Sequence, residues 1–143
     1  MYGRKEEMNH LKELYDSNRF EFLVMYGRRR FGKTTILQEF AENTNSIFFP
    51  AREKNDALNL EDFSKMIQYH FDKNFIASFQ SWEDALNYIG AKVEQRTAVI
   101  IDEFPYIIEE NPSIKSILQH TIDHNWKNKN IFLILCGSSV SIM

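Results

Sequence analysis

FEFLVMYGRRRFGKT, the sequence of residues 20–34, joins an apolar run to a glycine-containing turn. The apolar run at 20–26 predicts a short strand that is buried on both faces. The eight residues that follow match G-x-x-x-x-G-K-[ST] at every fixed position. In that pattern the glycines let the backbone wrap around an anion, and the next helix presents its positive dipole end. The segment therefore predicts a strand, a phosphate-binding loop and a helix in succession.

The loop predicts specific contacts to a nucleoside triphosphate. We expect Lys33 to reach the β- and γ-phosphates and Thr34 to ligate Mg²⁺ through its hydroxyl. The alternative is a glycine-containing turn that binds nothing, which the flanking strand and helix patterns disfavour. We interpret the three loop arginines as solvent-facing side chains in the field of the phosphates, not as a nucleic-acid patch. The expected phosphate-binding residues are Gly27, Arg28, Arg29, Arg30, Phe31, Gly32, Lys33, Thr34 and Thr35.

A second motif, AVIIDE at residues 98–103, places two carboxylates at the end of an apolar strand pattern. We expect Asp102 to hold Mg²⁺, directly or through water, and Glu103 to act as the general base on the attacking water. Alone, such a pattern is often only a strand end with solvated charges. Because it follows a complete phosphate loop, with further elements between, it predicts the catalytic half of the same site.

Apolar periodicity outlines the other elements. We expect helices at 6–17, 33–42, 58–71, 81–95 and 112–125, and strands at 20–26, 46–51, 97–101 and 130–136. Strands that alternate with helices indicate a mostly parallel sheet with helices on both faces. The predicted fold class is therefore α/β, a three-layer α/β/α P-loop NTPase sandwich, with residues 1–143 forming one partial domain that stops after the fourth strand.

Composition indicates a globular protein with no bias towards nucleic acid. The 143 residues include 17 Lys or Arg and 20 Asp or Glu, which gives a net charge of −3. This balance supplies no polyelectrolyte attraction to nucleic acid. The charged N-terminus has no apolar stretch behind it, so it does not read as a signal peptide, and no run is long enough to span a bilayer. We expect a cytoplasmic protein in which the single cysteine, Cys136, is a small core residue.

Several other features have plainer interpretations. His120 and His124 could face one metal from a helix, but no further ligands complete a site, and we expect a surface or packing role. The aromatic residues between 71 and 82 are expected to pack under the sheet. Arg52 follows the second strand, where parallel sheets bind ligands, and is a hypothetical contact to phosphate or to a partner subunit. A guanine-reading Asn-Lys-x-Asp is absent, since residues 128–131 read NKNI, which argues against a GTPase.

Four segments together resemble the archaeal and bacterial ATPase family, an AAA+-related branch of P-loop ATPases near the signalling ATPases with numerous domains. They are YGRKEE at 2–7, YGRRRFGKT at 26–34, IDEFPY at 101–106 and LCGSSV at 135–140. They occur in the family's order and span almost the whole chain. The resemblance implies that ATP is the nucleotide and that Gly3 and Arg4 lie against the adenine. It also implies a polar sensor after the fourth strand, best matched by Ser138 and then by Ser139.

The resemblance covers only the N-terminal portion of the family. Family members continue with another strand, a helical lid that carries a nucleotide-sensing arginine, and commonly a winged-helix and nuclease-like region. In an AAA+-type sheet the additional strand lies beside the phosphate-loop strand. We therefore expect residues 20–26 to form an exposed sheet edge, open to self-association or to a protein partner.

The function predicted from these features is Mg-ATP binding, with ATP hydrolysis in the full-length context. An alternative is a nucleotide-gated interaction module with slow or no hydrolysis, which the missing lid favours and the intact Glu103 disfavours. A third interpretation, a DNA-associated ATPase, is suggested by the family alone. We expect nucleotide binding to survive in this chain better than turnover.

Overall fold

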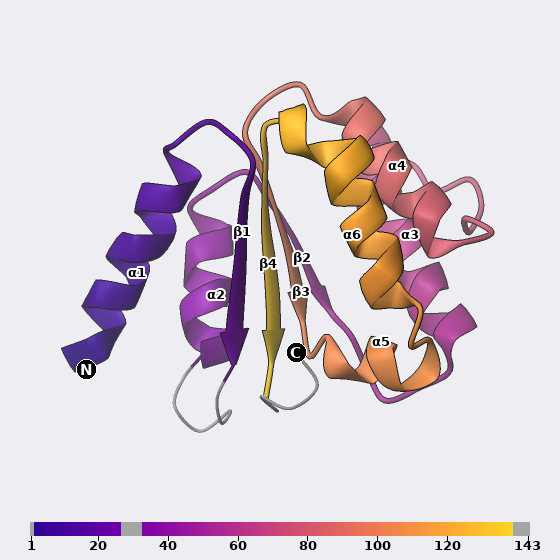
Figure 1. The fold of residues 1–143 in the computed structure, drawn as a ribbon, viewed down its shortest axis with the longest axis horizontal. Helices are drawn as coiled ribbons and strands as arrows, with labels where there is room; N and C mark the ends of the chain where they lie inside the picture. The colour runs from indigo at the N-terminus through magenta and orange to yellow at the C-terminus, as the bar shows by residue number, and fades with distance from the viewer. Residues whose placement is uncertain (1, 27–32, 139–143) are drawn as a thin grey trace.

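The computed structural model describes residues 2–26 and 33–138, with residues 2–4, 33 and 34 described by their backbone only. Within these ranges, no helix combines the length and the apolar character needed to cross a membrane. Helices and strands alternate along most of the chain (Figure 1). The elements are α1 (Tyr2–Tyr15), β1 (Glu21–Tyr26), α2 (Lys33–Glu42), β2 (Ser46–Pro50), α3 (Asp56–Asp72), α4 (Trp82–Lys92), β3 (Thr97–Asp102), α5 (Pro105–Glu110), α6 (Ile114–His124), the 3₁₀ turn η2 (Trp126–Asn128) and β4 (Ile131–Gly137).

The four strands form one sheet in the order β1-β4-β3-β2, and every neighbouring pair is parallel. Parallel strands need crossover connections, which here are the helices. All residues of β3 and β4 are buried, as expected for strands covered on both faces. The predicted α/β three-layer fold is confirmed, and the sheet is wholly parallel where the prediction was mostly parallel.

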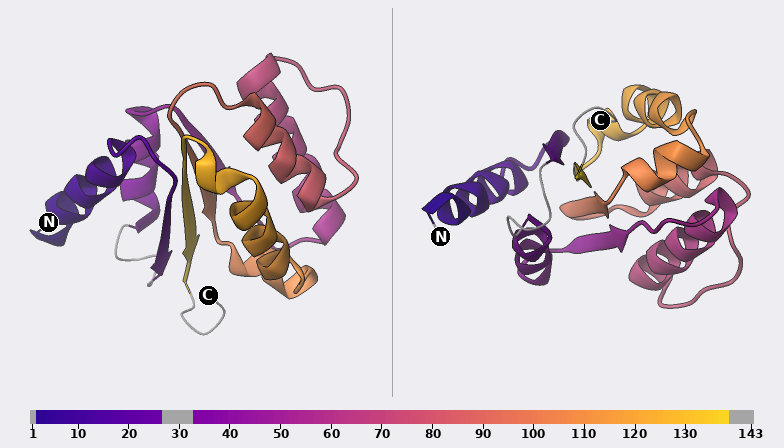
Figure 2. Two further views of the ribbon diagram at one scale, coloured as in Figure 1. Left: turned by 45° about the horizontal axis from the view of Figure 1, so that its top comes forward. Right: turned by 90° about the horizontal axis from the view of Figure 1, so that it is seen from below.

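Helices cover both faces of the sheet, and Figure 2 shows these layers from the end of the strands. α1 and α2 pack on one face around a core that includes Leu11, Leu37 and Phe40. α3, α4, α5 and α6 pack on the other face around a larger core that includes Phe63 and Trp126. The buried Cys136 belongs to the first core, which confirms its prediction as a core residue.

Two differences from the sequence prediction concern helix boundaries and short helices. α1 begins at Tyr2, four residues before the predicted start. The first turn was missed because Gly3 and the charged residues after it show no apolar periodicity. α5 was not predicted, because its six residues are too few to show helical periodicity. It begins with Pro105, whose fixed φ suits the first turn of a helix.

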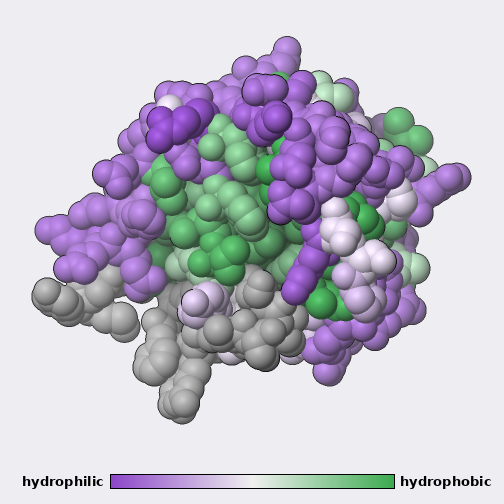
Figure 3. Space-filling view, viewed as in Figure 1, coloured by the Kyte–Doolittle hydropathy of each residue, from purple (hydrophilic) through white to green (hydrophobic). Residues whose placement is uncertain are grey.

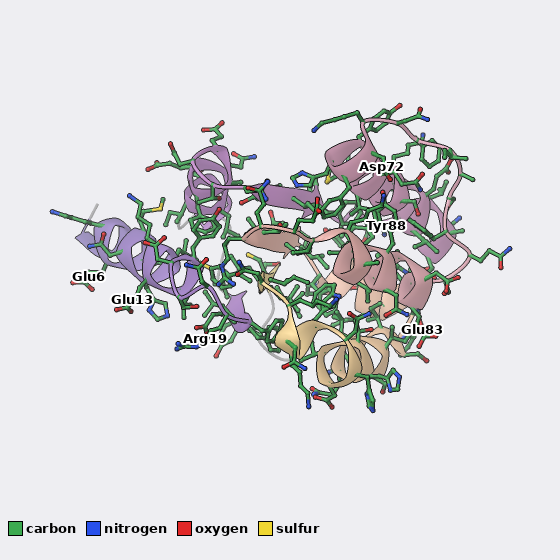
Figure 4. The ribbon with its side chains drawn as sticks, turned by 90° about the horizontal axis from the view of Figure 1, so that it is seen from above. Glu6, Glu13, Arg19, Asp72, Glu83 and Tyr88 are labelled. Atoms are coloured by element: carbon green, nitrogen blue, oxygen red, sulfur yellow. The ribbon has the colours of Figure 1, made fainter. Side chains whose placement is uncertain are left out.

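The segment between α3 and α4 packs as predicted, although its middle is a loop. Trp82 is 2% exposed, and Phe71 and Phe79 pack against the larger core. The C-terminal end of α3 is joined to α4 where the Tyr88 hydroxyl donates to Asp72, and Figure 4 labels both residues. This lobe lies on the far side of the sheet from α1.

Among the strands that the structure describes, β1 has a neighbour on one side only. Phe22 and Val24 line an apolar hollow towards α6, and Leu23 and Met25 line another towards α1. Phe22 remains 46% exposed. Figure 3 shows this apolar band on the face where α1, β1 and α6 lie, bordered by hydrophilic helix surfaces. The expected exposed edge is therefore present in the described part of the chain.

Candidate nucleotide-binding site

The carboxyl ends of all four strands lie level with one another, and this brings the predicted site residues to one edge. Tyr26 pairs with Gly137, and Pro50 pairs with Asp102. Neighbouring strands are about 4.8 Å apart, so two strand spacings of about 10 Å separate the end of β1 from Asp102. Ligands of parallel α/β sheets bind outside this edge. The strand order thus puts the end of β1 and the acid at the end of β3 on either side of β4.

α2 provides the helix that the phosphate-loop pattern requires. It begins at Lys33, and Ile36, Leu37 and Phe40 bury one face of it in the core. Packing of this face fixes the N-terminus of α2 beside the carboxyl edge of the sheet, where its dipole would favour an anion. Thr35 is exposed. The predicted contacts of residues 27–32, and the side chains of Lys33 and Thr34, lie outside the described part of the structure.

Asp102 ends β3 as a buried carboxylate, only 4% exposed. Its carbonyl oxygen accepts a hydrogen bond from the Ala51 amide at 2.9 Å, which joins it to the end of β2. Its Oδ1 atom accepts a hydrogen bond from the Glu103 amide at 2.9 Å. A carboxylate that is buried and oriented by the backbone in this way is suited to hold a cation at a fixed point of the edge.

Glu103 adopts a left-handed backbone conformation, with φ of 55°. Its neighbours explain why. Phe104 is 2% exposed in the core, and its amide donates to the Cys136 carbonyl at 2.9 Å, while Pro105 opens α5 at once. The left-handed residue thus lies between the end of β3 and the buried Phe104, directly before α5. A non-glycine residue in this region costs about 1–2 kcal/mol, and such strain concentrates at functional sites.

Ser138 and Arg52 extend the same edge on either side of Asp102. Ser138 is exposed and directly follows β4, while Ser139 lies outside the described residues. Arg52 lies two residues beyond Pro50, the register partner of Asp102. Its exposed side chain therefore stands at the β2 end of the edge, with β3 and β4 between it and the phosphate-loop strand. This position is farther from the predicted phosphates than that of Asp102.

A buried amide that sequence reasoning missed fixes the backbone of Arg52. Asn59 is fully buried in α3, and its Oδ1 accepts from the Arg52 amide at 3.2 Å while its Nδ2 donates to the Arg52 carbonyl at 3.0 Å. The Asn59 side chain thus pairs with both the backbone amide and the backbone carbonyl of Arg52. The only sequence signal was a polar residue on the face of α3 that also carries Phe63, a position otherwise reserved for apolar groups.

Gly3 and Arg4 lie in the first turn of α1, and this turn stands on the side of the molecule where the strands end (Figure 1). Their backbone therefore lies at the same end of the molecule as the candidate site, and the side chain of Arg4 is not described. Their predicted contact with adenine is untested by this arrangement.

The histidine pair on α6 shows no sign of a metal site. The rings of His120 and His124 stack with centroids 4.2 Å apart, and His124 Nδ1 lies 3.1 Å from the His120 carbonyl oxygen. Across residues 2–26 and 33–138, no three His, Cys, Asp or Glu side chains gather as metal ligands. The pair is exposed on the helix surface, in agreement with the surface role expected for it.

Comparison with known proteins identifies the family and the fold of the chain. The family of ATPase domains predominantly from Archaea matches residues 1–143. Uncharacterized protein MJECL04 of Methanocaldococcus jannaschii is 36% identical over 140 residues, which cover 98% of this chain and 30% of that protein. Uncharacterized ATP-binding protein MJ0423 of the same organism is 41% identical over 49 residues, or 30% of this chain and 83% of that protein. The chain thus spans about a third of the length of MJECL04.

Two solved structures share the fold. The Walker-type ATPase PABY2304 of Pyrococcus abyssi superposes with a TM-score of 0.70 at 20% identity, covering 99% of this chain and 47% of that one. Cdc6p from Pyrobaculum aerophilum superposes with a TM-score of 0.64 at 15% identity, covering 97% and 40% respectively. At these identities the likeness establishes the fold alone. Together with the family match over residues 1–143, it shows that the chain belongs to the family of ATPase domains found predominantly in Archaea, a class of nucleotide-binding domains.

Proposed function

We propose that the chain binds Mg-ATP at the carboxyl edge of its sheet and hydrolyses it in the full-length context. One observation carries the proposal. The buried Asp102 and the strained Glu103 end a strand whose carboxyl end is level with that of β1, which leads into the GRRRFGKT loop. The support for the proposal is that this oriented carboxylate ends a strand separated by one strand from β1, which precedes the GRRRFGKT sequence.

In this proposal each residue has a separate task. Lys33 and the amides of residues 27–34 neutralise the phosphate charge, and Thr34 and Asp102 hold Mg²⁺. The metal ion would draw charge from the phosphate oxygens as it develops during transfer. Glu103 accepts a proton from the attacking water, and Ser138 orients that water or the γ-phosphate. Most of the rate would then come from positioning and electrostatic stabilisation.

A nucleotide-gated interaction module is the second candidate function. The specific observation in its favour is that this chain spans 30% of the length of MJECL04, so groups needed for rapid turnover can lie elsewhere in a longer protein. In that case ATP occupancy changes the affinity for a partner, and hydrolysis is slow. Nucleotide binding in this chain is then stronger evidence of function than its rate of hydrolysis.

Binding and hydrolysis of ATP with Mg²⁺ test the proposal in three chains. The parent should bind and turn over, Lys33→Ala should lose binding, and Glu103→Gln should bind without turnover. Glu110→Gln is the matched control, because Glu110 is an exposed carboxylate a few residues along on α5. It should behave as the parent.

The outcomes separate the two candidates. A parent that binds ATP but does not hydrolyse it is an incomplete ATPase or a gated module, and turnover by the full-length protein then separates these two. A parent that binds neither ATP nor Mg-ATP contradicts both. Equal turnover in Glu103→Gln and the parent would remove Glu103 from the mechanism. Loss of ATP binding in Asp102→Asn only when Mg²⁺ is present would support Asp102 as the metal ligand, because the neutral amide is a weaker ligand.

Association with DNA can be tested with the same ATPase measurement. The Drosophila ORC structure that shares the fold, with a TM-score of 0.56 at 13% identity, is described as bound to AT-rich DNA and Cdc6. Our chain carries a net charge of −3, which gives DNA no general attraction to it. Turnover measured with and without duplex DNA decides the point, and unchanged turnover and no retention of DNA would exclude this role for the chain.

We further propose that the isolated chain self-associates through the edge of β1 that no described strand covers. An unpaired apolar edge offers backbone donors and acceptors to another strand, and the hollows on both sides of β1 can accept its side chains. Phe22→Lys should lower the concentration-dependent mass measured by light scattering. Tyr69→Lys is the control, since Tyr69 is 54% exposed on α3, away from this edge. Equal effects of the two substitutions would contradict an edge-specific contact.

A further inference from the structure

The hollow on the α6 side of β1 reaches the residue that follows the proposed general base. It has a volume of about 210 Å³ and a mostly apolar lining, to which β1 contributes Phe22 and Val24. Leu135 and Phe104 also line it, opposite residues of α6. Phe104 is almost fully buried, whereas Phe22 is half-exposed. Because Phe104 directly follows Glu103, one side chain lies between the sheet edge and the candidate site.

The burial of Phe104 holds the turn at Glu103. The Glu103 amide donates to Asp102 Oδ1, and the Phe104 amide donates to the Cys136 carbonyl, each at 2.9 Å. Glu103 itself has a φ of 55°, which is unfavourable for a residue other than glycine. This strain favours opening of the turn, and the packing of Phe104 opposes it. The hollow gives the Phe104 ring space to move when the turn opens.

Antiparallel pairing of β1 with β1 of a second copy would cover this hollow. Among the described strands, β1 has a neighbour on one side only. Side chains alternate along a strand, so Phe22 and Val24 face the α6 side, while Leu23 and Met25 face the hollow towards α1. A two-fold axis between two such strands keeps each apolar set beside its equivalent. Phe22 and Val24 of each copy then lie against the α6-side hollow of the other.

Charges at the two ends of β1 favour a second copy as the occupant. α1 runs antiparallel to β1, so Glu6 and Glu7 lie near the carboxyl end of the strand, where they line the α1-side hollow (Figure 1). Arg19 lies two residues before β1, and its side chain is 77% exposed. Figure 4 labels Glu6 near the start of α1 and Arg19 beside its end. In an antiparallel pair the amino end of one strand meets the carboxyl end of the other, so each Arg19 approaches the two glutamates of the other copy.

We propose that two copies of the chain pair along β1 and that this pairing raises the rate of ATP hydrolysis by holding Glu103 in place. When the second copy covers the hollow, the Phe104 ring has no space to leave, and the turn opens less often. The fraction of chains with an oriented base then rises. The inference rests on the proposed function and adds a regulation of it by association. ATP affinity should stay the same, because the proposed phosphate contacts do not involve Phe104.

Turnover per chain, measured over a range of chain concentrations beside the molar mass from light scattering, tests the inference. We expect turnover per chain to rise by at least about 10-fold as the dimer forms, a small part of the 10²–10⁴-fold that a general base contributes. Amide hydrogen exchange at Glu103 and Phe104 should slow over the same range of concentrations. The exchange measurement does not depend on ATP.

Charge reversal tests the antiparallel arrangement. Arg19→Glu should keep the chain monomeric, with turnover at its dilute value at every concentration. Addition of Glu6→Arg and Glu7→Arg to this variant should restore both the dimer and the rise in turnover, because the attractions form again with their signs exchanged. Lys12→Glu is the matched control, since Lys12 is an exposed cation of α1 on the side that faces α2. It should associate and turn over as the parent does.

Phe104→Leu separates the coupling from the association. Leucine leaves space beside Glu103 even when the hollow is covered, so this variant should still dimerise while its turnover per chain stays near the dilute value. Ile107→Val is the control for a general change in the core. Ile107 is a fully buried residue of α5 in the same core, outside the described lining of the hollow. It should keep the rise in turnover.

Each result decides the question. Constant turnover per chain while the molar mass doubles overturns the coupling, and a dimer that tolerates Arg19→Glu overturns the arrangement on which the coupling depends. A chain that stays monomeric overturns the inference together with the proposed self-association. All three outcomes leave ATP binding and the role of Glu103 intact. A parent that binds no ATP contradicts the proposed function instead, and unaltered amide exchange at Glu103 and Phe104 in the dimer would then overturn the inference independently.

Discussion

The polar residues at the two ends of the sheet differ in how they are paired and in their backbone conformation. At the amino ends of the strands, the buried Arg96 donates to two carbonyls at the end of α1, and Asn45 Nδ2 donates to the Arg96 carbonyl. At the carboxyl ends, Asp102 is buried, Glu103 is held at φ of 55°, and Ser138 is exposed. The first end is arranged for stability, and the second accepts strain and exposure that a ligand could use.

This difference shows that polar residues of one chain can stabilise the fold at one end of the sheet and remain available for a ligand at the other. Satisfied buried networks rigidify a fold, since breaking them leaves unpaired groups in a medium of low dielectric. Residues at a binding edge must instead keep capacity for a ligand, which limits how much they contribute to stability. The following predictions test whether stability and activity divide between the two ends as this contrast requires.

The largest effect is expected from Arg96→Met. Methionine fills part of the space but offers no donors, so four part-buried acceptors lose the Arg96 donor. We expect the free energy of unfolding to fall by about 3 kcal/mol, measured by urea denaturation. Arg19→Met at the same end is the control, because the Arg19 side chain is 77% exposed and should contribute less than about 0.5 kcal/mol. Similar losses in both variants would contradict the special role of the amino end.

An intermediate effect is expected from Asn59→Ala, which tests a buried support of the carboxyl end. The substitution removes both hydrogen bonds to the Arg52 backbone and leaves that peptide partly unpaired. We expect a loss of about 2 kcal/mol, with faster amide exchange at residues 51–55. Asn74→Ala, at an exposed loop position, should be close to neutral. A neutral Asn59→Ala would mean that the backbone beside Asp102 needs no such support.

The smallest effect on stability is expected from Glu103→Gly, which should stabilise the chain where the two preceding substitutions destabilise it. Glycine adopts positive φ without a steric penalty, so unfolding free energy should rise by up to about 1 kcal/mol while ATP turnover is lost. Lys73→Gly provides a matched control, because Lys73 also has a left-handed backbone, at φ of 57°, and ends α3 far from the site. It should gain similar stability and keep turnover. A loss of stability in Glu103→Gly would show that the glutamate is not strained.

Much of the candidate site could be predicted from the sequence because its residues are local to single elements. A glycine pattern after an apolar run predicts a phosphate loop, and an apolar run before two acids predicts a strand end with carboxylates. The structure places α2 at Lys33 and ends β3 at Asp102, as these patterns indicate. The chemical assignment of the loop, Mg²⁺ and Glu103 stays a prediction, since the loop itself lies outside the described residues.

The tertiary structure alone decided which residues support that site. Arg96 and Asn59 belong to no motif in the sequence. Their roles arise from hydrogen-bond partners elsewhere in the chain, up to 82 residues away for Arg96. The left-handed turn at Glu103 likewise depends on where Phe104 must be buried. The strand order, with β1 at an edge, follows from how the helices cross the two faces. Local sequence patterns determine whether a segment forms a helix or a strand. Burial and hydrogen bonding between elements determine which partners each polar group has, because a buried polar group must be paired.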